Sequence, residues 1–256
     1  RRRPDLVHTH TAKAGAVGRI AALACRRTSS GRRVRLVHTY HGHVFEGYFG
    51  GWQTRIFLGI ERWLGRRTDA IVAISPRIRD DVLYTYRIAT VDQVRTIPLG
   101  FDLDRFAAIT PDDRARARRE LDLPADAVVV TTVGRLTAIK RQTLLLKMAA
   151  RLVPRIRGLL VLVAGDGELR GELETEAREL GIARLVRFLG WRGDLERIYG
   201  ASDVFVLTSR NEGTPVALIE AMASAVPSVS TDVGGVRDVV TGPELGLVVP
   251  FGRPEM

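Results

Sequence analysis

Residues 204–224 read VFVLTSRNEGTPVALIEAMAS, an apolar strand, a polar loop and an apolar helix in succession. We expect the strand at 204–207 and the helix at 215–224, because Pro215 suits the first turn of a helix. The same alternation of short apolar runs and helical segments recurs along most of the chain, which is typical of parallel sheets built from βαβ units. The sequence therefore predicts an α/β fold.

The other expected elements continue this alternation. Strands are expected at 5–9, 34–39, 70–74, 94–97, 127–133, 159–164, 185–189, 228–230 and 246–249. Helices are expected at 12–27, 53–67, from Pro76, and at 111–121, 141–155, 168–180 and 194–199.

A turn-rich stretch, PLGFDLD at residues 98–104, has neither helical nor strand periodicity and separates two α/β modules. We therefore expect domains at 1–98 and 99–256. The chain opens on three arginines without a methionine and stops soon after its last expected strand. We expect an excerpt of a longer protein, with the first domain partial and the end of the second one missing.

Charge is distributed unevenly between these modules. The 256 residues carry a formal charge of +10. Residues 1–95 contain 18 Arg and Lys against 7 Asp and Glu, whereas the rest of the chain contains 21 against 22. This basic excess favours nucleic acid or an anionic membrane surface as a partner of the first module. Codon usage is the alternative explanation for the arginines.

Composition excludes several classes of protein. The single cysteine, Cys25, excludes a disulfide framework and a multi-cysteine metal site. No apolar run reaches the roughly 18 residues of a membrane span, and no signal-peptide pattern opens the chain. We therefore expect a cytoplasmic protein.

The loop and helix start in the opening stretch form the strongest candidate site. Gly213 permits close backbone approach and Thr214 can cap the helix, whose N–H groups and dipole favour an anion. Glu220 lies one turn after Val216, on a helix whose neighbouring residues are apolar or small. A buried carboxylate must be paired, protonated or bound to a ligand. A structural pair with a buried arginine is the alternative, but the second carboxylate, Glu212, favours a ligand site.

A second candidate follows the long apolar strand at 127–133. Gly134 is followed by Arg135 and Lys140, two cations five residues apart that could neutralise a diphosphate. A solvated loop with ordinary surface charges is the alternative. The P-loop pattern is absent, and the glycines at 165–171 do not match GxGxxG, so NAD binding is not expected. Both candidates follow strands, where ligands bind in open α/β sheets.

All five histidines lie within the first 43 residues, and His8 and His10 are spaced as His-x-His at a strand end. A metal-dependent hydrolase would need ligands from later strands, and no histidine follows His43. We expect no metal, and one or two histidines lining a cleft as uncharged hydrogen-bonding groups. Asp102 and Asp104 imitate an Asp-x-Asp metal motif, but a turn explains them better.

Five motifs follow one another between residues 133 and 235. They are VGR with Lys140, AGDG at 164–167, FLG at 188–190, EGTP leading to EAMA at 212–223, and TDVGG at 231–235. Together they resemble the family 4 retaining glycosyltransferases of GT-B fold, whose Glu-x7-Glu spacing fits Glu212 and Glu220. LVHTHTAKAG at 6–15 is similar to a late N-domain strand of that family with its histidine. Ala225 departs from the pattern, since the family usually has glycine there.

This resemblance implies two Rossmann-like modules facing across a cleft, a truncated acceptor-side domain at 1–98 and a nucleotide-sugar-binding domain at 99–256. It implies that Glu212 and His10 reach the transferred sugar as the catalytic pair. The loops at 165–168 and 188–190 would flank the base. The implied donor-binding residues are Gly134, Arg135, Lys140, Gly213, Thr214, Pro215, Val216 and Glu220, with the two cations on the diphosphate and Glu220 on the ribose.

We therefore expect a metal-independent retaining glycosyltransferase that moves a hexosyl or N-acetylhexosaminyl group in envelope polysaccharide biosynthesis. The donor is a nucleotide-sugar, with UDP the expected nucleotide, and the acceptor is lipid-linked or a saccharide. The donor is a co-substrate, and no cofactor is expected. The basic residues 1–95 fit a peripheral enzyme on the inner face of a membrane.

Two alternatives stay open. A GT-B nucleotide-sugar epimerase would need no acceptor. A non-enzymatic basic nucleic-acid-binding module would bind with a steep salt dependence. Nucleic acid is not the expected partner, because the arginines are not interleaved with aromatic residues on an evident strand platform.

Overall fold

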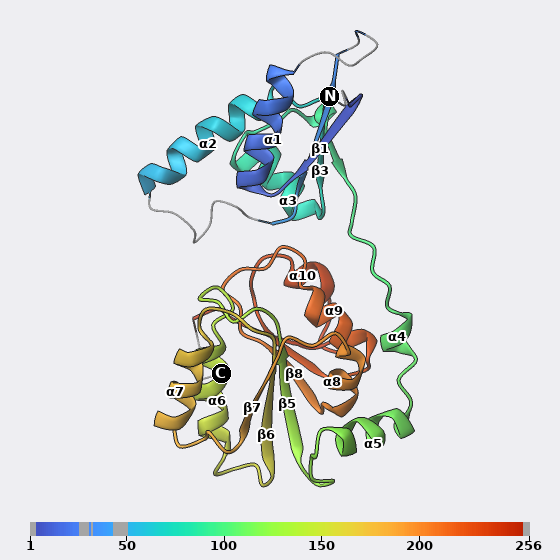
Figure 1. Cartoon of the computed structure of the whole chain (residues 1–256), viewed down its shortest axis with the longest axis vertical. Coiled ribbons are helices and arrows are strands. Elements are labelled where there is room, and N and C mark those ends of the chain that lie inside the picture. Colours follow the sequence, from blue (N-terminus) through green and yellow to red (C-terminus); the bar gives the residue numbers. More distant parts are fainter. Residues whose placement is uncertain (1–3, 26–30, 32, 43–50, 253–256) are drawn as a thin grey trace. The chain divides into compact units, whose positions relative to one another are not determined.

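The computed structural model describes residues 4–25, 31, 33–42 and 51–252 of the chain (Figure 1). Contacts between Cα atoms divide the chain into two compact units, Arg1–Gly100 with Glu212–Thr214, and Phe101–Asn211 with Pro215–Met256. Each unit contains one parallel sheet. The prediction of an α/β chain with two Rossmann-like modules is therefore confirmed, whereas their arrangement across a cleft and the boundary at 98/99 stay predictions.

The sheet of the first unit has its four strands side by side in chain order. They are β1 (Leu6–His10), β2 (Arg35–Tyr40), β3 (Ala70–Ala73) and β4 (Val94–Thr96). The helices between them are α1 (Ala12–Ala24), α2 (Gly51–Gly65) and α3 (Pro76–Asp80), followed by a π-helical turn at Asp81–Thr85 and a 3₁₀ turn at Val91–Gln93. Because βαβ crossovers are right-handed, strands in chain order place their helices on one face of the sheet.

Helix α1 lies very close to the strands it covers. A Cβ atom at Gly15 would lie 2.4 Å from Cε1 of His38, and one at Gly18 would lie 2.8 Å from Cγ2 of Thr9. Only glycine fits such an approach without moving the strand side chains. These two glycines therefore fix how α1 packs on β1 and β2.

A buried ion pair joins α1, α2 and β2. Nη2 of Arg19 lies 2.8 and 2.7 Å from the two carboxylate oxygens of Glu61, and the Tyr40 hydroxyl donates to Oε2 of Glu61 over 2.6 Å. Arg19, Tyr40 and Glu61 are at most 4% exposed. The sequence pattern gave no sign of this cluster, because its members lie on three elements far apart in the chain.

The sheet of the second unit has the order β10-β9-β8-β5-β6-β7. Its strands are β5 (Val128–Val133), β6 (Leu159–Ala164), β7 (Val186–Gly190), β8 (Val204–Leu207), β9 (Ser228–Thr231) and β10 (Leu247–Val249). Counted from β5, this is the 3-2-1-4-5-6 order of the Rossmann fold. The chain therefore first builds one half of the sheet outward from β5, and then returns to build the other half from β8.

Helices cover both faces of this second sheet (Figure 1). They are α4 (Asp104–Ala107), α5 (Pro111–Glu120), α6 (Gln142–Leu152), α7 (Arg170–Glu179), α8 (Leu195–Ala201), α9 (Val216–Ala223) and α10 (Val236–Val239). One core cluster joins α6 and α7 to β5 and β6 through residues such as Leu145 and Leu173. Another joins α8 and α9 to β8 through residues such as Tyr199 and Leu218.

The expected elements are present, with shifts of one to three residues at most ends. Strands β6 and β8 have the predicted bounds, and Ser75 caps α3 at Pro76 as that proline suggested. The short helices α4 and α10 were not predicted, since four residues are too few to show a helical period. The predicted end of α1 at Arg27 lies outside the described residues.

Candidate functional site

The strand order of the second unit reverses between β5 and β8, which are hydrogen-bonded neighbours. At such a switch point the loops that leave the two strands run in opposite directions, and a crevice opens at their carboxyl ends. The loop after β5 contains Gly134, Arg135 and Lys140, and the loop after β8 leads to Glu212. The two candidate motifs of the sequence are therefore neighbours in the fold.

Hydrogen bonds tie these two loops together. The Thr208 hydroxyl lies 2.9 Å from the carbonyl oxygen of Lys140 and 3.0 Å from that of Arg141. The backbone N–H of Arg210 donates to the carbonyl of Ile139 over 2.7 Å. From β9, the Thr231 hydroxyl donates to the carbonyl of Ser209 over 2.6 Å. These bonds hold the two loops against each other at the end of the sheet.

The glycine after β5 has a positive φ of 152°, a region that favours glycine. The loop after β6 crosses it closely, because a Cβ atom at Gly165 would lie 2.0 Å from the carbonyl oxygen of Gly134. A Cβ at Gly167 would likewise lie 2.4 Å from the carbonyl oxygen of Leu136. The AGDG and VGR motifs therefore meet backbone to backbone, which explains their glycines without any dinucleotide motif.

The two cations of the β5 loop lie in different surroundings. The Arg135 side chain is 75% exposed, and its Nη2 lies 3.6 Å from Oε2 of the exposed Glu168. Exposed ion pairs of this kind contribute little, so Arg135 can exchange its partner readily. The Lys140 side chain is partly buried and folds back along the loop, with Cε within 3.8 Å of the Cβ position at Gly134. Both cations thus belong to the crevice side of β5.

Helix α9 begins at Val216, with Pro215 in the N-cap position. The prediction that Thr214 caps this helix is wrong, since the first helical hydrogen bonds, from Leu218 and Ile219, go to the carbonyl of Pro215. Proline before the helix leaves the first turn without a capping side chain. The N–H groups of Val216 and Ala217 then precede the first bonds of the helix and remain its natural anion-binding donors.

Glu220 is half-buried on α9, and its partner is a tyrosine rather than the arginine considered from the sequence. The hydroxyl of the buried Tyr199, on α8, lies 3.0 Å from Oε2 of Glu220 and 3.0 Å from the carbonyl oxygen of Ala217. Burial raises the pKa of Glu220, against the opposing effects of the Tyr199 hydrogen bond and the Arg105 charge. Burial and the carboxylate together also raise the pKa of Tyr199.

The sequence could not have indicated Tyr199, because an aromatic residue on an amphipathic helix normally predicts only a core position. It occupies the core between α8 and α9 and carries its hydroxyl to the carboxylate at the same time. Arg105, on the unpredicted helix α4, forms an ion pair with Glu196 at 3.6 Å and adds positive charge near Glu220. The Tyr199 hydroxyl on α8 therefore positions the carboxylate, and the Arg105 charge on α4 acts on its pKa.

Glu212 and Gly213 lie in the loop between β8 and α9, and the Glu212 side chain is buried. The sequence order brings this carboxylate to the carboxyl end of β8, four residues before the start of α9. Its contact with a sugar stays a prediction.

The histidines of the first unit gather at the carboxyl ends of β1 and β2. Nδ1 of His10 lies 2.8 Å from Nε2 of His41, and the rings of His8 and His10 are 4.3 Å apart. His8 Nε2 lies 2.8 Å from the Thr39 hydroxyl, whereas His38 lies on the covered face of the sheet, 2.8 Å from the Thr9 hydroxyl. His10 is exposed at this edge, as its predicted role requires.

The pKa values of His8, His38 and His41 are lowered, which favours their neutral forms. Burial lowers the pKa of His38 to about 3, with the Arg19 charge as the next cause. Burial also lowers the pKa of His8 and of His41, and the neighbouring His10 lowers both further. The expectation of uncharged hydrogen-bonding histidines agrees with these shifts, while His43 lies outside the described residues.

Two features are absent from the part of the chain that the structure describes. The His, Cys, Asp and Glu side chains of this part nowhere converge in groups of three or more suited to hold a metal ion. No helix among the described residues combines the length and the apolar composition needed to cross a bilayer. Independence from metal stays a prediction.

A Rossmann-ordered sheet with cations, a helix start and a half-buried carboxylate at its switch point is the arrangement in which α/β proteins commonly bind nucleotides. Matches to two protein-family models identify the class more closely. The profile of the glycosyl transferases group 1 matches residues 113–256, and that of glycosyltransferase family 4 matches residues 1–105. The chain belongs to this family of GT-B glycosyltransferases.

Individual relatives agree with this assignment. A D-inositol 3-phosphate glycosyltransferase of Saccharomonospora viridis is 36% identical over 264 residues, covering 96% of this chain and 58% of the relative. A UDP-Gal:α-D-GlcNAc-diphosphoundecaprenol α-1,3-galactosyltransferase of Escherichia coli is 30% identical, covering 90% of this chain and 58% of the relative.

Among solved structures, HepE of Anabaena in complex with UDP and glucose superposes with a TM-score of 0.83 at 25% identity. That match covers 98% of this chain and 65% of HepE. The sucrose-phosphate synthase of Thermosynechococcus elongatus has a TM-score of 0.80 at 26% identity, with 98% and 62% covered. The chain thus spans less than two thirds of the length of these relatives.

Proposed function

We propose that this protein transfers a sugar from a nucleotide-sugar, with UDP as the nucleotide, to a lipid-linked or saccharide acceptor, with retention and without a metal ion. One observation carries the proposal: the β5 loop with its two cations and the β8 loop leading to α9 are hydrogen-bonded together at the switch point of a Rossmann-ordered sheet. The named relatives that act on UDP-Gal or were solved with UDP and glucose support UDP.

The chemistry follows from where charge develops. Breaking the bond between sugar and phosphate leaves negative charge on the nucleotide diphosphate. Arg135, Lys140 and the first N–H groups of α9 are fixed groups that stabilise this charge as it forms, which lowers the barrier. Because these three sources of positive potential are built into the chain, the leaving group needs no divalent cation.

Glu220 is assigned to the ribose of the donor. Its carboxylate is fixed by the Tyr199 hydroxyl at 3.0 Å and keeps further acceptor capacity for sugar hydroxyls. Glu212 and the exposed His10 are assigned to the transferred sugar. The acceptor hydroxyl attacks the face from which the diphosphate departs, which retains the configuration at the anomeric carbon, and no side chain is assigned as a covalent nucleophile.

The acceptor is assigned to the first unit. Its basic excess within residues 1–95 favours an anionic membrane surface, where a lipid-linked acceptor is presented. The protein would then be peripheral on the inner face of that membrane.

The test is a screen of UDP-sugars with lipid-linked and saccharide acceptors, read by product mass and by the anomeric configuration of the product. We expect a glycoside with the donor's configuration, formed equally well with a chelator present. Epimerised UDP-sugar without any acceptor would identify an epimerase instead, and an inverted product or a strict need for metal would contradict the proposed mechanism.

A further inference from the structure

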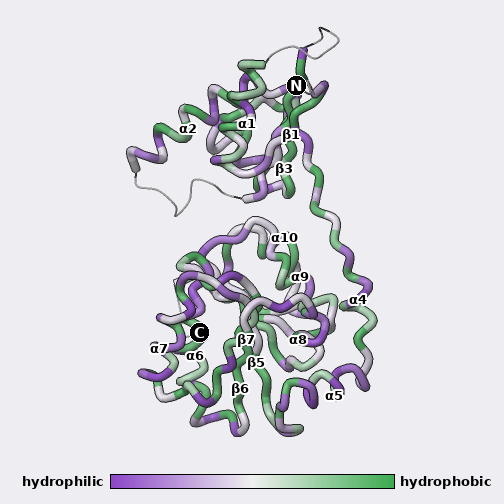
Figure 2. Tube along the Cα trace, in the orientation of Figure 1, coloured by the Kyte–Doolittle hydropathy of each residue, from purple (hydrophilic) through white to green (hydrophobic). Residues whose placement is uncertain are grey.

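Helix α2 has a face that the rest of its unit does not cover. Trp52, Ile56, Ile60 and Trp63 are 69%, 53%, 38% and 46% exposed. The side that carries Glu61 is buried in the ion pair to Arg19, and Leu64, between that side and the stripe, lies in the core. Hydrophobic and hydrophilic residues accordingly alternate along α2 (Figure 2).

The four exposed residues form a single stripe, called here the α2 stripe. Their spacings of four, four and three residues place them within an arc of about 80° on a helix of 3.6 residues per turn. A contiguous exposed stripe of two tryptophans and two isoleucines is a binding surface rather than scattered surface apolarity. The exposed Arg55 lies within the same helix, so positive charge accompanies the stripe.

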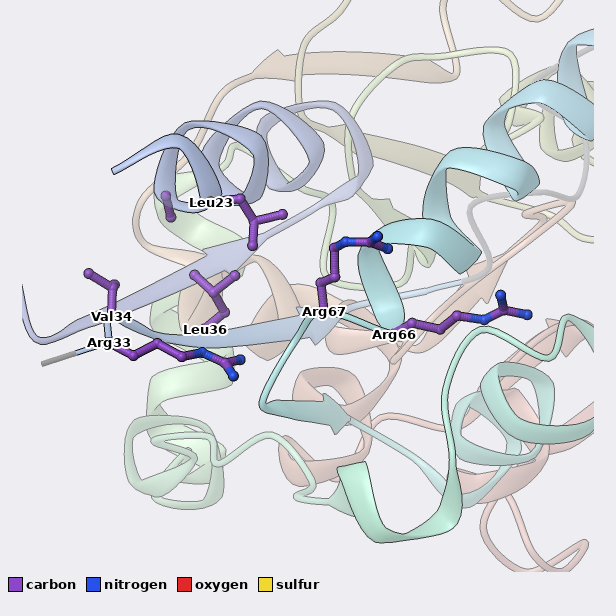
Figure 3. A pocket seen from close by; sticks show the side chains of 7 residues that line it. Leu23, Arg33, Val34, Leu36, Arg66 and Arg67 are labelled. Atoms are coloured by element: carbon purple, nitrogen blue, oxygen red, sulfur yellow. The ribbon is translucent and has the colours of Figure 1, made fainter. Parts of the chain in front are cut away.

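A second feature adjoins the carboxyl end of this helix. A cavity of about 270 Å³ is lined by the apolar side chains of Ala22, Leu23, Val34 and Leu36 and by three arginines, Arg33, Arg66 and Arg67 (Figure 3). This set is called the arginine pocket. It joins the stripe through Arg67, whose guanidinium carbon lies 4.4 Å from the centre of the Trp63 ring.

The arginine pocket keeps a positive excess despite a nearby carboxylate. Asp69 accepts hydrogen bonds from Arg33 at 3.1 Å and from Arg35 at 3.2 Å, so one carboxylate is shared by two guanidinium groups. Arg66 and Arg67 are exposed and face solvent beside it. Guanidinium groups bind phosphate through paired hydrogen bonds, and the apolar lining suits the glycerol and first methylene groups behind a lipid phosphate.

We propose that the α2 stripe and the arginine pocket together form the docking surface for a bilayer that contains anionic phospholipids. Helix α2 lies in the plane of the interface with its tryptophans at headgroup depth, and the arginines bind lipid phosphates. Tryptophan, isoleucine and arginine on one helix surface are the composition of interfacial helices. The net charge of residues 1–95, 18 basic against 7 acidic residues, favours an anionic surface over a protein groove.

This inference rests on the proposed function in one respect: a docked enzyme can reach a lipid-linked acceptor, which gives the docking surface a role in transfer. The docking surface can be tested without any transfer reaction. The probes are vesicles of phosphatidylcholine alone and of phosphatidylcholine mixed with phosphatidylglycerol.

The first experiment uses the fluorescence of the two α2 tryptophans. The chain has three tryptophans, so Trp191→Phe leaves only Trp52 and Trp63. We expect their emission to shift to the blue, and to be quenched by brominated lipid, with the phosphatidylglycerol vesicles but not with phosphatidylcholine alone. High salt should weaken this binding. If the protein binds the phosphatidylglycerol vesicles but its tryptophan emission does not change, α2 does not contact the bilayer and the proposal is wrong.

The second experiment compares variants by vesicle sedimentation. Ile56→Ser with Ile60→Ser should lower the partition coefficient by about tenfold or more, since both side chains lose apolar contact. Arg66→Gln should lower it by about fivefold, the equivalent of about 1 kcal/mol. Trp191→Gln and Arg119→Gln, exposed positions of the second unit, are the matched controls and should leave binding unchanged.

The outcomes separate this inference from the proposed function. Variants that lose vesicle binding but bind UDP as before support the docking surface, whatever the transfer assay shows. Equal vesicle binding by the α2 stripe variants and the controls overturns it, even where transfer activity is found. A change in oligomeric state with the stripe variants, without a change in vesicle binding, would instead assign the stripe to a second copy of the chain and overturn the membrane assignment.

Discussion

The two units use the same architecture, a parallel sheet with helical crossovers, but they place their chemistry differently. In the second unit the strand order reverses at β5 and β8, and the candidate cations, helix start and carboxylate follow those two strands. The described strands of the first unit run in chain order without a reversal, and a cluster of histidines lies at the carboxyl ends of β1 and β2. The comparison teaches that the predicted anion site follows topology rather than net charge: it belongs to the nearly neutral second unit, whereas the basic excess belongs to residues 1–95.

The units also differ in what holds them together. The first unit has a buried ion pair between α1 and α2 in addition to its apolar clusters, whereas the second has apolar clusters on both faces of its sheet. Substitutions can therefore address the two units separately.

The largest expected effect is the loss of the buried ion pair. Glu61→Ala leaves the Arg19 charge buried without its partner and should destabilise the first unit by about 3–5 kcal/mol. Chemical unfolding followed by hydrogen exchange measures this, with the exposed Glu172→Ala as the control. UDP binding by the second unit should persist. Equal stability of Glu61→Ala and Glu172→Ala would show that the pair does not hold α1 to α2.

The next largest expected effect tests whether Lys140 binds the diphosphate or is an ordinary surface charge. Lys140→Ala should weaken UDP binding by about 10- to 100-fold, because a charge-assisted contact to phosphate contributes about 1.5–3 kcal/mol. Calorimetric titration measures this. Lys147→Ala is the matched control, since Lys147 is 59% exposed and pairs with Glu176. If both variants bind UDP alike, the β5 loop is only a solvated loop.

A smaller effect tests whether Tyr199 positions Glu220. Tyr199→Phe keeps the core filled but removes the hydroxyl that lowers the pKa of Glu220, so that pKa rises further. We expect the affinity for UDP to fall about fivefold, because the lost hydrogen bond contributes about 1 kcal/mol to the binding free energy.

The pH profile distinguishes this role from a purely structural one. The carboxylate accepts ribose hydroxyls only when ionised, so affinity is lost as the pH falls through the pKa of Glu220. In Tyr199→Phe this loss should begin at a higher pH than in the parent, whereas the exposed Tyr84→Phe should not change the profile. An unchanged profile in Tyr199→Phe would leave Tyr199 as a core residue only.

The smallest effect concerns the end of α9. Ala225 has a positive φ of 54°, and the N–H groups of Ala225 and Val226 bond back to Met222 and Ala221 as in a Schellman motif. Glycine normally takes this position, which explains the glycine of the family pattern and makes Ala225 a strained exception. Ala225→Gly should raise the free energy of unfolding of the second unit by about 0.5–1 kcal/mol. Thermal unfolding measures this, and Ala223→Gly, inside α9, should lower it instead.

The sequence predicted the elements well where apolar runs were long. Strands β6 and β8 have the expected bounds because continuous apolar runs between turn residues leave little choice. The family and the α/β class are likewise confirmed, since the motifs occupy the loops after the strands. The roles of the individual site residues stay predictions.

The sequence could not predict contacts between residues that lie far apart in the chain. Tyr199 and Glu220 lie on different helices, as do Arg19 and Glu61, and no local pattern indicates that they meet. The start of α9 was predicted one residue too early, because Thr214 before Pro215 matches the pattern of a capping residue followed by a first-turn proline, whereas Pro215 itself is the N-cap. The α2 stripe was also missed, since a helical stripe of apolar residues normally predicts the buried face.

The most direct test of the central claim is hydrogen exchange of the chain with and without UDP. UDP bound at the β5/β8 switch point should slow exchange at residues 134–141 and 208–219, and should leave β1 to β4 unchanged. Protection confined to the first unit, or to the α6 and α7 side of the second sheet, would contradict the assignment of the nucleotide site.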